Sequence, residues 1–246
     1  MQTHILKTAE VLGVTAGERA ANMIKNTIFE RGVAHIILAT GTSQFETLKY
    51  LISDQAIEWD KVIMFHLDEY IGITSSHKAS FGKYLTERFI EKVSVLKAAY
   101  LINDESDPTV ECKRLSDLIR KHPIDIALMG IGENGHLAFN DPPADFETEE
   151  PYIVVSLDED CRQQQMNEGW FHSLEEVPLQ AISLSIKQIM KSKHIICSVP
   201  DERKAKAVRD CLQKGISNIF PASILQQHGA CDIYLDNGSA SLLDSL

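Results

Sequence analysis

Short runs of apolar residues, rich in Ile and Val, alternate along the chain with longer amphipathic stretches. Several of these runs are continuous, which is typical of strands that are covered on both faces. The runs predict strands at residues 35–39, 62–65, 124–129, 152–155, 194–199 and 232–235. The amphipathic stretches predict helices at residues 15–31, 43–53, 80–93, 110–121 and 201–213. This alternation predicts an α/β fold, in which helices cover both faces of a parallel or mostly parallel sheet.

Local signals set the expected ends of two of these helices. Thr15-x-x-Glu18 and Ser43-x-x-Glu46 both have the form of a capping box, in which two side chains satisfy the free backbone N–H groups at a helix start. Gly32 is well placed to end the first helix, because glycine readily adopts the left-handed conformation found there.

The chain shows no internal repeat, low-complexity tract or Pro/Gly/Ser-rich linker. One domain over residues 1–246 is therefore the simplest account. Two stretches lack a strand or helix pattern of this kind. Residues 141–150 are acidic and proline-bearing, and residues 161–177 are polar with two aromatic side chains. They predict a lid over a site, around residues 142–178.

The charge balance narrows the class of partner. The chain carries 24 Lys and Arg against 35 Asp and Glu, a formal net charge of −11. Nucleic acids and anionic membranes are bound by basic surfaces, so neither is expected as a partner. No signal-peptide pattern and no apolar run of about 20 residues is present. The five cysteines are scattered without a Cys-x-x-Cys pair, so we expect reduced thiols and a cytoplasmic protein.

Candidate chemistry follows the predicted strands, because ligands of open α/β sheets bind beyond the carboxyl ends of the strands. After the first strand, Gly41 allows close backbone approach, and Thr42 and Ser43 open a helix whose free N–H groups can bind an anion. A plain turn with a helix cap is the structural alternative. After a later strand, Lys204 can reach the same anion or be a solvated helix residue.

Two adjacent carboxylates, Asp68 and Glu69, follow the second strand. They point in different directions, so they are not expected to share one proton. A partly desolvated carboxylate at a strand end suits a general base, although an acidic cap for the following segment is equally consistent with the sequence.

The short segment 130–143 contains three glycines, two asparagines, His136 and Asp141. Packing alone does not require this concentration of flexible and hydrogen-bonding residues. Imidazole exchanges protons near neutral pH, and a nearby carboxylate fixes its tautomer. No histidine pair has metal-ligand spacing, so we expect no metal, and no Gly-x-Ser-x-Gly turn indicates a serine nucleophile.

Taken together, these segments resemble the glucosamine-6-phosphate deaminase/isomerase family. The resemblance rests on Phe65–Tyr70, Ser80-Phe81, and Met129–Pro142, with the Thr40-Gly41 turn and Lys204-Ala205 at the expected intervals. It covers nearly the whole chain. It implies a Rossmann-like three-layer αβα sandwich, shared with phosphogluconolactonases and ribose-5-phosphate isomerases.

The resemblance also implies an activity that needs no cofactor: an aminosugar phosphate, glucosamine 6-phosphate or a close epimer, becomes a ketose phosphate and ammonia through an enolamine. By similarity, Asp68 carries the proton between C2 and C1, and His136 opens the sugar ring. Asn134 and Asp141 orient His136. Thr42 and Ser43 hold the phosphate together with Lys204 and the turn at Gly41. Assembly into a homo-oligomer is left open.

The chain departs from the family pattern at four places. Gly41-Thr42-Ser43-Gln44 replaces the usual Gly-Gly-Thr-Pro turn, Asp141 replaces the commoner Glu, and Asn134 stands where some members have Asp. The arginine that grips phosphate in well-studied members aligns near Asn167, and Arg162, five residues earlier, is expected to substitute for it. The residues for proton transfer match the family pattern more closely than those that hold the substrate, so the resemblance does not determine which sugar is bound.

Two other functions fit the same fold. A 6-phosphogluconolactonase also has a Gly-His in its third-strand loop, but typically has Asp-Glu-Arg and a Pro-Asp-Gly-His turn, so Tyr70 and Asn134 disfavour it. A sugar-phosphate sensor fused to a transcription regulator needs a basic DNA-binding helix, and nothing basic of that kind precedes residue 30. A sensor would also not need Asp68 as a proton carrier.

Overall fold

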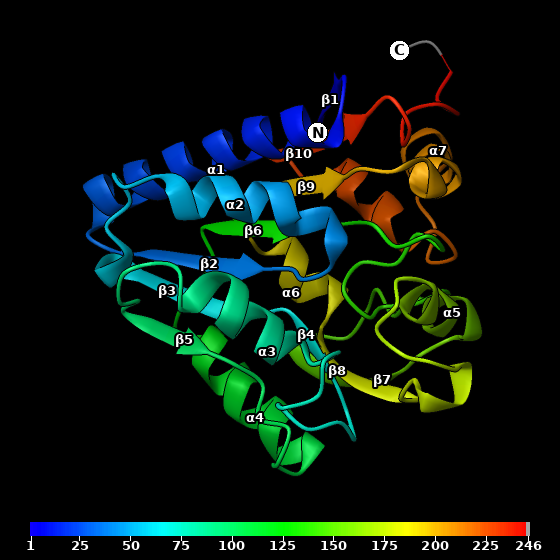
Figure 1. Cartoon of the computed structure of the whole chain (residues 1–246), viewed down its shortest axis with the longest axis horizontal. Coiled ribbons are helices and arrows are strands. Elements are labelled where there is room, and N and C mark those ends of the chain that lie inside the picture. The colour runs from blue at the N-terminus through cyan, green and yellow to red at the C-terminus, as the bar shows by residue number, and fades with distance from the viewer. Residues whose placement is uncertain (245–246) are drawn as a thin grey trace.

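The larger of two sheets forms the centre of the computed structural model, which describes residues 1–244 (Figure 1). All its neighbouring strands run parallel. In sheet order the strands are β1 (Gln2–Leu6), β10 (Cys231–Asp236), β9 (His194–Val199), β6 (Ile126–Met129), β2 (Ala34–Leu38), β3 (Val62–His66) and β5 (Ala98–Tyr100). Five of the six predicted strands lie in this sheet, which confirms the predicted parallel architecture.

The strand order reverses between β2 and β6. From β2 the chain adds β3 and β5 towards one edge, then returns to the other side of β2 and adds β6, β9 and β10. The loops that leave β2 and β6 therefore diverge and open a crevice at the carboxyl ends of these strands. Such a reversal is where open α/β sheets bind their ligands.

Helices cover both faces of the sheet, and each face has its own core. On one face lie α1 (Ala9–Arg31), α2 (Phe45–Ser53) and α3 (Phe81–Leu85); on the other lie α4 (Pro108–Ile119), α6 (Ile186–Met190) and α7 (Ala205–Gln213). Within β2, Ile36 and Leu38 join the first core, whereas Ile37 joins the second. The continuous apolar runs are thus strands buried on both sides, and the three-layer prediction is confirmed.

A second sheet is antiparallel, in the order β4 (Asp68–Tyr70), β8 (Gln180–Leu184), β7 (Tyr152–Ser156). The strand predicted at 152–155 belongs here and not to the parallel sheet. Its burial alternates from Tyr152 to Ser156, as expected for a strand with one covered face. The strands β1, β4, β5 and β8 and the helix α6 were not predicted; each has only three to five residues, too few for a clear period. The helix at Glu159–Asn167 was not predicted either, since its segment is predominantly polar.

The first helix begins earlier than predicted. Its N-cap is Thr8, whose side chain accepts from Val11 N at 3.3 Å, and Thr15 lies inside the helix and donates to the carbonyl of Val11. The capping box at Thr15 is therefore wrong. The first turns were not predicted because they contain Gly13, and glycine lowers intrinsic helix propensity. The helix ends as predicted, at Gly32 with φ 77°.

Three other predicted helices change hydrogen-bonding pattern along their length. Residues 42–53 begin as a 3-10 turn, Thr42–Gln44, and continue as α2; residues 202–213 likewise begin as the 3-10 turn Glu202–Lys204 and continue as α7. Helix α3 starts at its cap, Ser80, and passes into a π-helical turn at Thr86–Ile90. No helix within residues 1–244 has both the length and the apolar character needed to span a membrane.

Candidate active site

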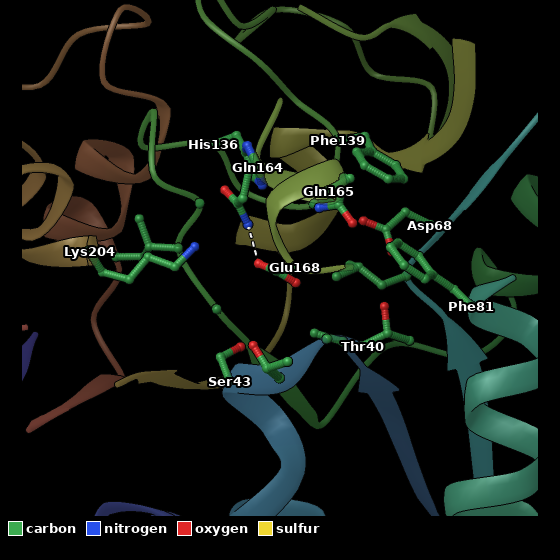
Figure 2. Close-up of a pocket in the computed structure, with 18 residues that line it drawn as sticks. Thr40, Ser43, Asp68, Phe81, His136, Phe139, Gln164, Gln165, Glu168 and Lys204 are labelled. Atoms are coloured by element: carbon green, nitrogen blue, oxygen red, sulfur yellow. Dashed lines mark hydrogen bonds between the residues drawn. The ribbon is translucent and has the colours of Figure 1, made fainter. Parts of the chain in front are cut away.

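One pocket lies at the reversal of strand order and is lined by Phe81 of α3 and by five further segments that are far apart in the sequence (Figure 2). The turn after β2 supplies Thr40–Ser43, and the link from β3 to β4 supplies Asp68. The loop after β6 lines it from Gly130 to Phe139, and the turn after β9 supplies Lys204. The fifth segment is α5 (Glu159–Asn167) and the residues that follow it. Three predicted strand-end segments and the lysine thus meet in one place.

The turn after β2 forms one wall of the pocket. Gly41 has φ 91°, a backbone conformation that only glycine adopts readily, and it turns the chain into the following helix. Ser43 does not cap that helix, contrary to the predicted capping box. Its hydroxyl accepts from Gln44 Nε2 at 3.1 Å, and the same amide donates to Met129 O at 3.0 Å. Gln44 therefore ties the turn after β2 to the end of β6.

Lys204 is a pocket residue and not a solvated helix residue, since only 6% of it is exposed. The turn that carries it is capped by Asp201, whose side chain accepts from Arg203 N. Burial lowers the pKa of Lys204, and the charges of Glu168 and Glu133 partly oppose this. These carboxylates act through charge alone, so the ammonium group is free to bind an anion in the pocket.

Asp68 lies where the chain leaves the parallel sheet and joins the antiparallel one. It is 5% exposed, and burial followed by the neighbouring charge of Glu69 raises its pKa well above the usual value. No hydrogen bond counters this effect. A carboxylate in this environment binds a proton more strongly than a solvated one, which suits a base that removes protons from carbon.

Glu69 points away from Asp68, as predicted, and has a structural task. Its carboxylate accepts from the backbone N–H groups of Tyr70, Phe81 and Gly82 and from the Ser80 hydroxyl, all at 2.8–3.1 Å. Burial raises the pKa of Glu69, and these hydrogen bonds counter that rise. Each of the two interpretations of the acidic pair therefore applies to one residue. Glu69 is the acidic cap, and Asp68 faces the pocket.

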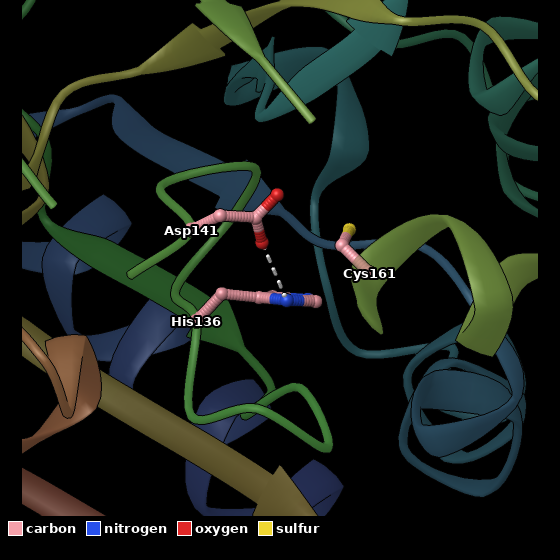
Figure 3. A group of neighbouring side chains, drawn as sticks. All are labelled: His136, Asp141 and Cys161. Carbon is pink, nitrogen blue, oxygen red and sulfur yellow. Dashed lines mark ion pairs between the residues drawn. The ribbon is translucent and has the colours of Figure 1, made fainter. Parts of the chain in front are cut away.

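His136 lines the pocket, and the carboxylate of Asp141 faces its ring (Figure 3). His136 Nδ1 is 3.1 Å from Asp141 Oδ1. Asp141 also accepts from Asn134 Nδ2 and Asp158 N, and Asn134 Oδ1 accepts from His136 N at 3.1 Å. Burial would raise the pKa of Asp141, but the interaction with His136 and these hydrogen bonds outweigh it and lower the pKa. Asn134 and Asp141 thus hold the imidazole without lining the pocket.

Asp158 belongs to this set of hydrogen-bonded residues and was not predicted. It accepts from Asn134 Nδ2 at 3.1 Å and caps α5 by accepting from Cys161 N. Its signal in the sequence is that of an ordinary helix cap, so nothing there pointed to the pocket.

The glycines of the loop after β6 leave space for the imidazole. A Cβ on Gly132 would lie 2.2 Å from His136 Cε1, closer than any real contact. Gly135 has φ 88°, which lets the chain turn directly before His136. The concentration of glycine in this loop therefore follows from ring placement.

The group in Figure 3 includes the residues of 1–244 best placed to hold a metal ion. Potential ligand atoms of His136, Asp141 and Cys161 all lie within 4.8 Å of one another. In this arrangement Asp141 accepts hydrogen bonds from Asn134 and Asp158 and lies against the imidazole of His136.

Arg162, which is expected to hold the phosphate, lies outside the pocket lining. Its guanidinium donates to the backbone carbonyls of Leu174 and Val177. Helix α5 lines the pocket instead through Gln164 and Gln165, with Glu168 just beyond the helix. The sequence predicts that this polar segment is part of a lid, but its pattern does not show which of its side chains line the pocket.

Comparison with known proteins gives a consistent set of relatives. Residues 7–233 match the family described as glucosamine-6-phosphate isomerases/6-phosphogluconolactonase. A glucosamine-6-phosphate deaminase of Exiguobacterium sibiricum is 35% identical over 235 residues, which are 94% of this chain and 91% of the relative. The solved structure of a monomeric glucosamine-6-phosphate deaminase has TM-score 0.91 and 32% identity, covering 99% of this chain and all of that one. A 6-phosphogluconolactonase of Trypanosoma brucei has TM-score 0.82 at 15% identity, covering 99% of this chain and 98% of that one, and shares the fold.

Proposed function

The chain belongs to the glucosamine-6-phosphate isomerase/6-phosphogluconolactonase family, and from this premise we propose that it is an aminosugar-phosphate deaminase. It converts glucosamine 6-phosphate, or a close epimer, to a ketose 6-phosphate and ammonia. The observation that carries this proposal is the presence, in one buried pocket, of a desolvated carboxylate, a carboxylate-supported imidazole and a buried lysine.

The phosphate is bound at the turn after β2. Thr42 and Ser43 offer hydroxyl groups and the N–H groups of a helix start, and Lys204 supplies the positive charge. Because Lys204 is buried, its interaction with a phosphate is less screened than that of a surface lysine.

His136 opens the sugar ring. The ring opens when the C1 hydroxyl loses a proton and the ring oxygen gains one. Asp141 holds Nδ1 of the imidazole, which leaves Nε2 to exchange these protons with the substrate.

Asp68 then moves the proton between carbons. Its carboxylate removes the C2 proton of the open chain, and the aldehyde oxygen gains the proton that the substrate's ammonium group loses, which leaves an enolamine with a double bond between C1 and C2. The same proton returns to C1, which gives an imine at C2. Water adds to this imine and ammonia leaves, so the products are the ketose phosphate and ammonia.

An ammonia-release assay with glucosamine and galactosamine 6-phosphates tests the proposal and separates the epimers. We expect release from at least one of them, and Asp68→Asn should abolish it while the protein stays folded. No release from either substrate would overturn the proposal. Acid release from 6-phosphogluconolactone would instead support the hydrolase alternative.

Two expectations about the whole protein remain predictions alongside this activity. One is residence in the cytoplasm. The other concerns assembly, since the solved deaminase described above is monomeric. Molar mass from light scattering during size-exclusion chromatography decides between a monomer and a homo-oligomer.

A further inference from the structure

The pocket contains a second carboxylate, Glu168, for which the chemistry above has no use. It follows the last turn of α5 and lines the pocket with Lys204. Figure 2 shows it between Lys204 on one side and Asp68 on the other, above Ser43. The pocket thus combines two carboxylates with a single lysine or arginine side chain among its lining residues.

Glu168 is held in this place from both sides. Gln164 Nε2 donates to its Oε1 at 2.9 Å, and Trp170 Nε1 donates to its Oε2 at 3.3 Å. Gln164 is itself anchored, because its Oε1 accepts from Glu133 N at 2.8 Å in the loop after β6. The carboxylate is therefore a built part of the pocket and not a mobile surface group.

Glu168 acts on Lys204, the residue proposed to bind the phosphate. Among the charged groups near Lys204, Glu168 has the largest effect on it. A phosphate bound to Lys204 comes near this carboxylate, and two like charges in a partly desolvated site repel each other. A ligand that also carries a positive charge offsets part of this repulsion.

We propose that Glu168 is a specificity-determining residue that disfavours doubly negative phosphates and so selects a phosphate ester that also carries an ammonium group. The proposal rests on the proposed function, because it explains how that pocket distinguishes an aminosugar phosphate from a neutral sugar phosphate. It also gives a reason for the lack of a second cation beside Lys204 among the lining residues.

Calorimetry with ligands that cannot react tests this. The probes are inorganic phosphate, 1,5-anhydroglucitol 6-phosphate and its 2-amino-2-deoxy analogue, near neutral pH, where most of the amine is protonated and most of the phosphate is doubly negative. In Glu168→Gln we expect the first two to bind about tenfold tighter, as like-charge repulsion of moderate strength requires. The amino analogue should gain clearly less, so its advantage over the neutral sugar shrinks.

Glu175→Gln is the matched control. Glu175 lies on the same segment, is exposed and does not line the pocket, so its variant has the same change in net charge and should bind all three probes as the parent does. Glu168→Ala removes the side chain altogether and should show the same order of effects, with thermal unfolding as the check on folding.

Unchanged phosphate affinity in both Glu168 variants would overturn the proposal. So would a selective loss of the amino analogue with unchanged phosphate binding, which would make Glu168 a direct ligand of the ammonium group. Because these probes do not react, a protein that shifts its binding as expected but releases no ammonia would refute the deaminase activity alone.

Discussion

At the scale of single residues, the neighbouring carboxylates Asp68 and Glu69 show how direction decides function. Both are buried, yet Glu69 accepts four hydrogen bonds and Asp68 accepts none from the protein. These donors counter the rise that burial causes in the pKa of Glu69, and the charge of Glu69 helps to raise the pKa of Asp68.

The pH profile should report this coupling. Asp68 acts as a base only when deprotonated, and its pKa is raised, so activity should fall with decreasing pH already well above the usual carboxylate value of 3.8. Glu69→Gln removes the neighbouring charge, lowers the pKa of Asp68 and should move this acid limb of kcat/KM to lower pH. Ser80→Ala removes one hydrogen bond but keeps the charge, and should leave the limb near its original position. A limb that is unmoved in Glu69→Gln would contradict the assignment.

Gly132 should be as important for activity as a residue that touches substrate. In Gly132→Ala the new Cβ would overlap the His136 ring at 2.2 Å, so the ring has to leave its place. A displacement of about 1 Å costs roughly a hundredfold in rate, so we expect at least that loss in kcat. The unfolding free energy should fall by only about 1–3 kcal/mol. Gly215→Ala is the control, because its Cβ would meet nothing within 4 Å.

Sequence reasoning at this scale succeeded where a residue follows a strand and failed on α5. Asp68, His136 and Lys204 were predicted because strand ends converge in this fold class. Arg162 was wrong, since its direction depends on the carbonyls of Leu174 and Val177, which are set by tertiary packing. Glu168 was missed because an acid in a polar helical segment reads as a solvent-facing group.

At the scale of elements, the longest helix, α1, packs closely against α2 through two of its glycines. Gly13 and Gly17 face α2, and a Cβ on Gly13 would lie 2.2 Å from Glu46 Cβ and 2.9 Å from its Cα. The elements missed in the sequence also depend on their neighbours. Strands such as β4 and β5 have three residues each, and their pairing partners, not their own pattern, define them.

Gly13→Ala should therefore destabilise the protein despite the better helix propensity of alanine. Propensity favours alanine by about 1 kcal/mol, but overpacking against backbone typically costs about 1–3 kcal/mol. Since the clash involves backbone atoms of α2, we expect a net loss of unfolding free energy in urea. Asn22→Ala, at an exposed position of the same helix, should be neutral or slightly stabilising. A stabilised Gly13→Ala would show that α1 and α2 can separate freely.

At the scale of the whole molecule, one pocket residue, Lys204, lowers the stability of the free protein and favours the binding of an anion. Lys204 is buried with no ion pair of its own, and burial lowers its pKa, so its charge is unfavourable until an anion arrives. The fold itself was predictable at this scale, because continuous apolar runs separated by helices specify a covered parallel sheet. The second sheet was not, since its strands are short or pair across long stretches of chain.

Lys204→Met should separate these two effects. Without ligand, we expect the variant to unfold at the same or a higher temperature than the parent, because an unpaired buried charge is replaced by an apolar side chain of similar length. With inorganic phosphate, the parent should gain stability by mass action, roughly 2.7 kcal/mol at a hundredfold excess over Kd, and the variant should not. Equal stabilisation of both proteins by phosphate would remove Lys204 from the anion site.

Because the strand order reverses, the pocket is built from two parts of the chain that a single break can separate. A break in the segment 101–107, between β5 and α4, would place Asp68 and the turn after β2 on one piece of the chain. His136 and Lys204 would lie on the other piece, so neither piece alone contains the complete pocket. We therefore expect the proposed activity to return only when the two pieces associate and complete the pocket.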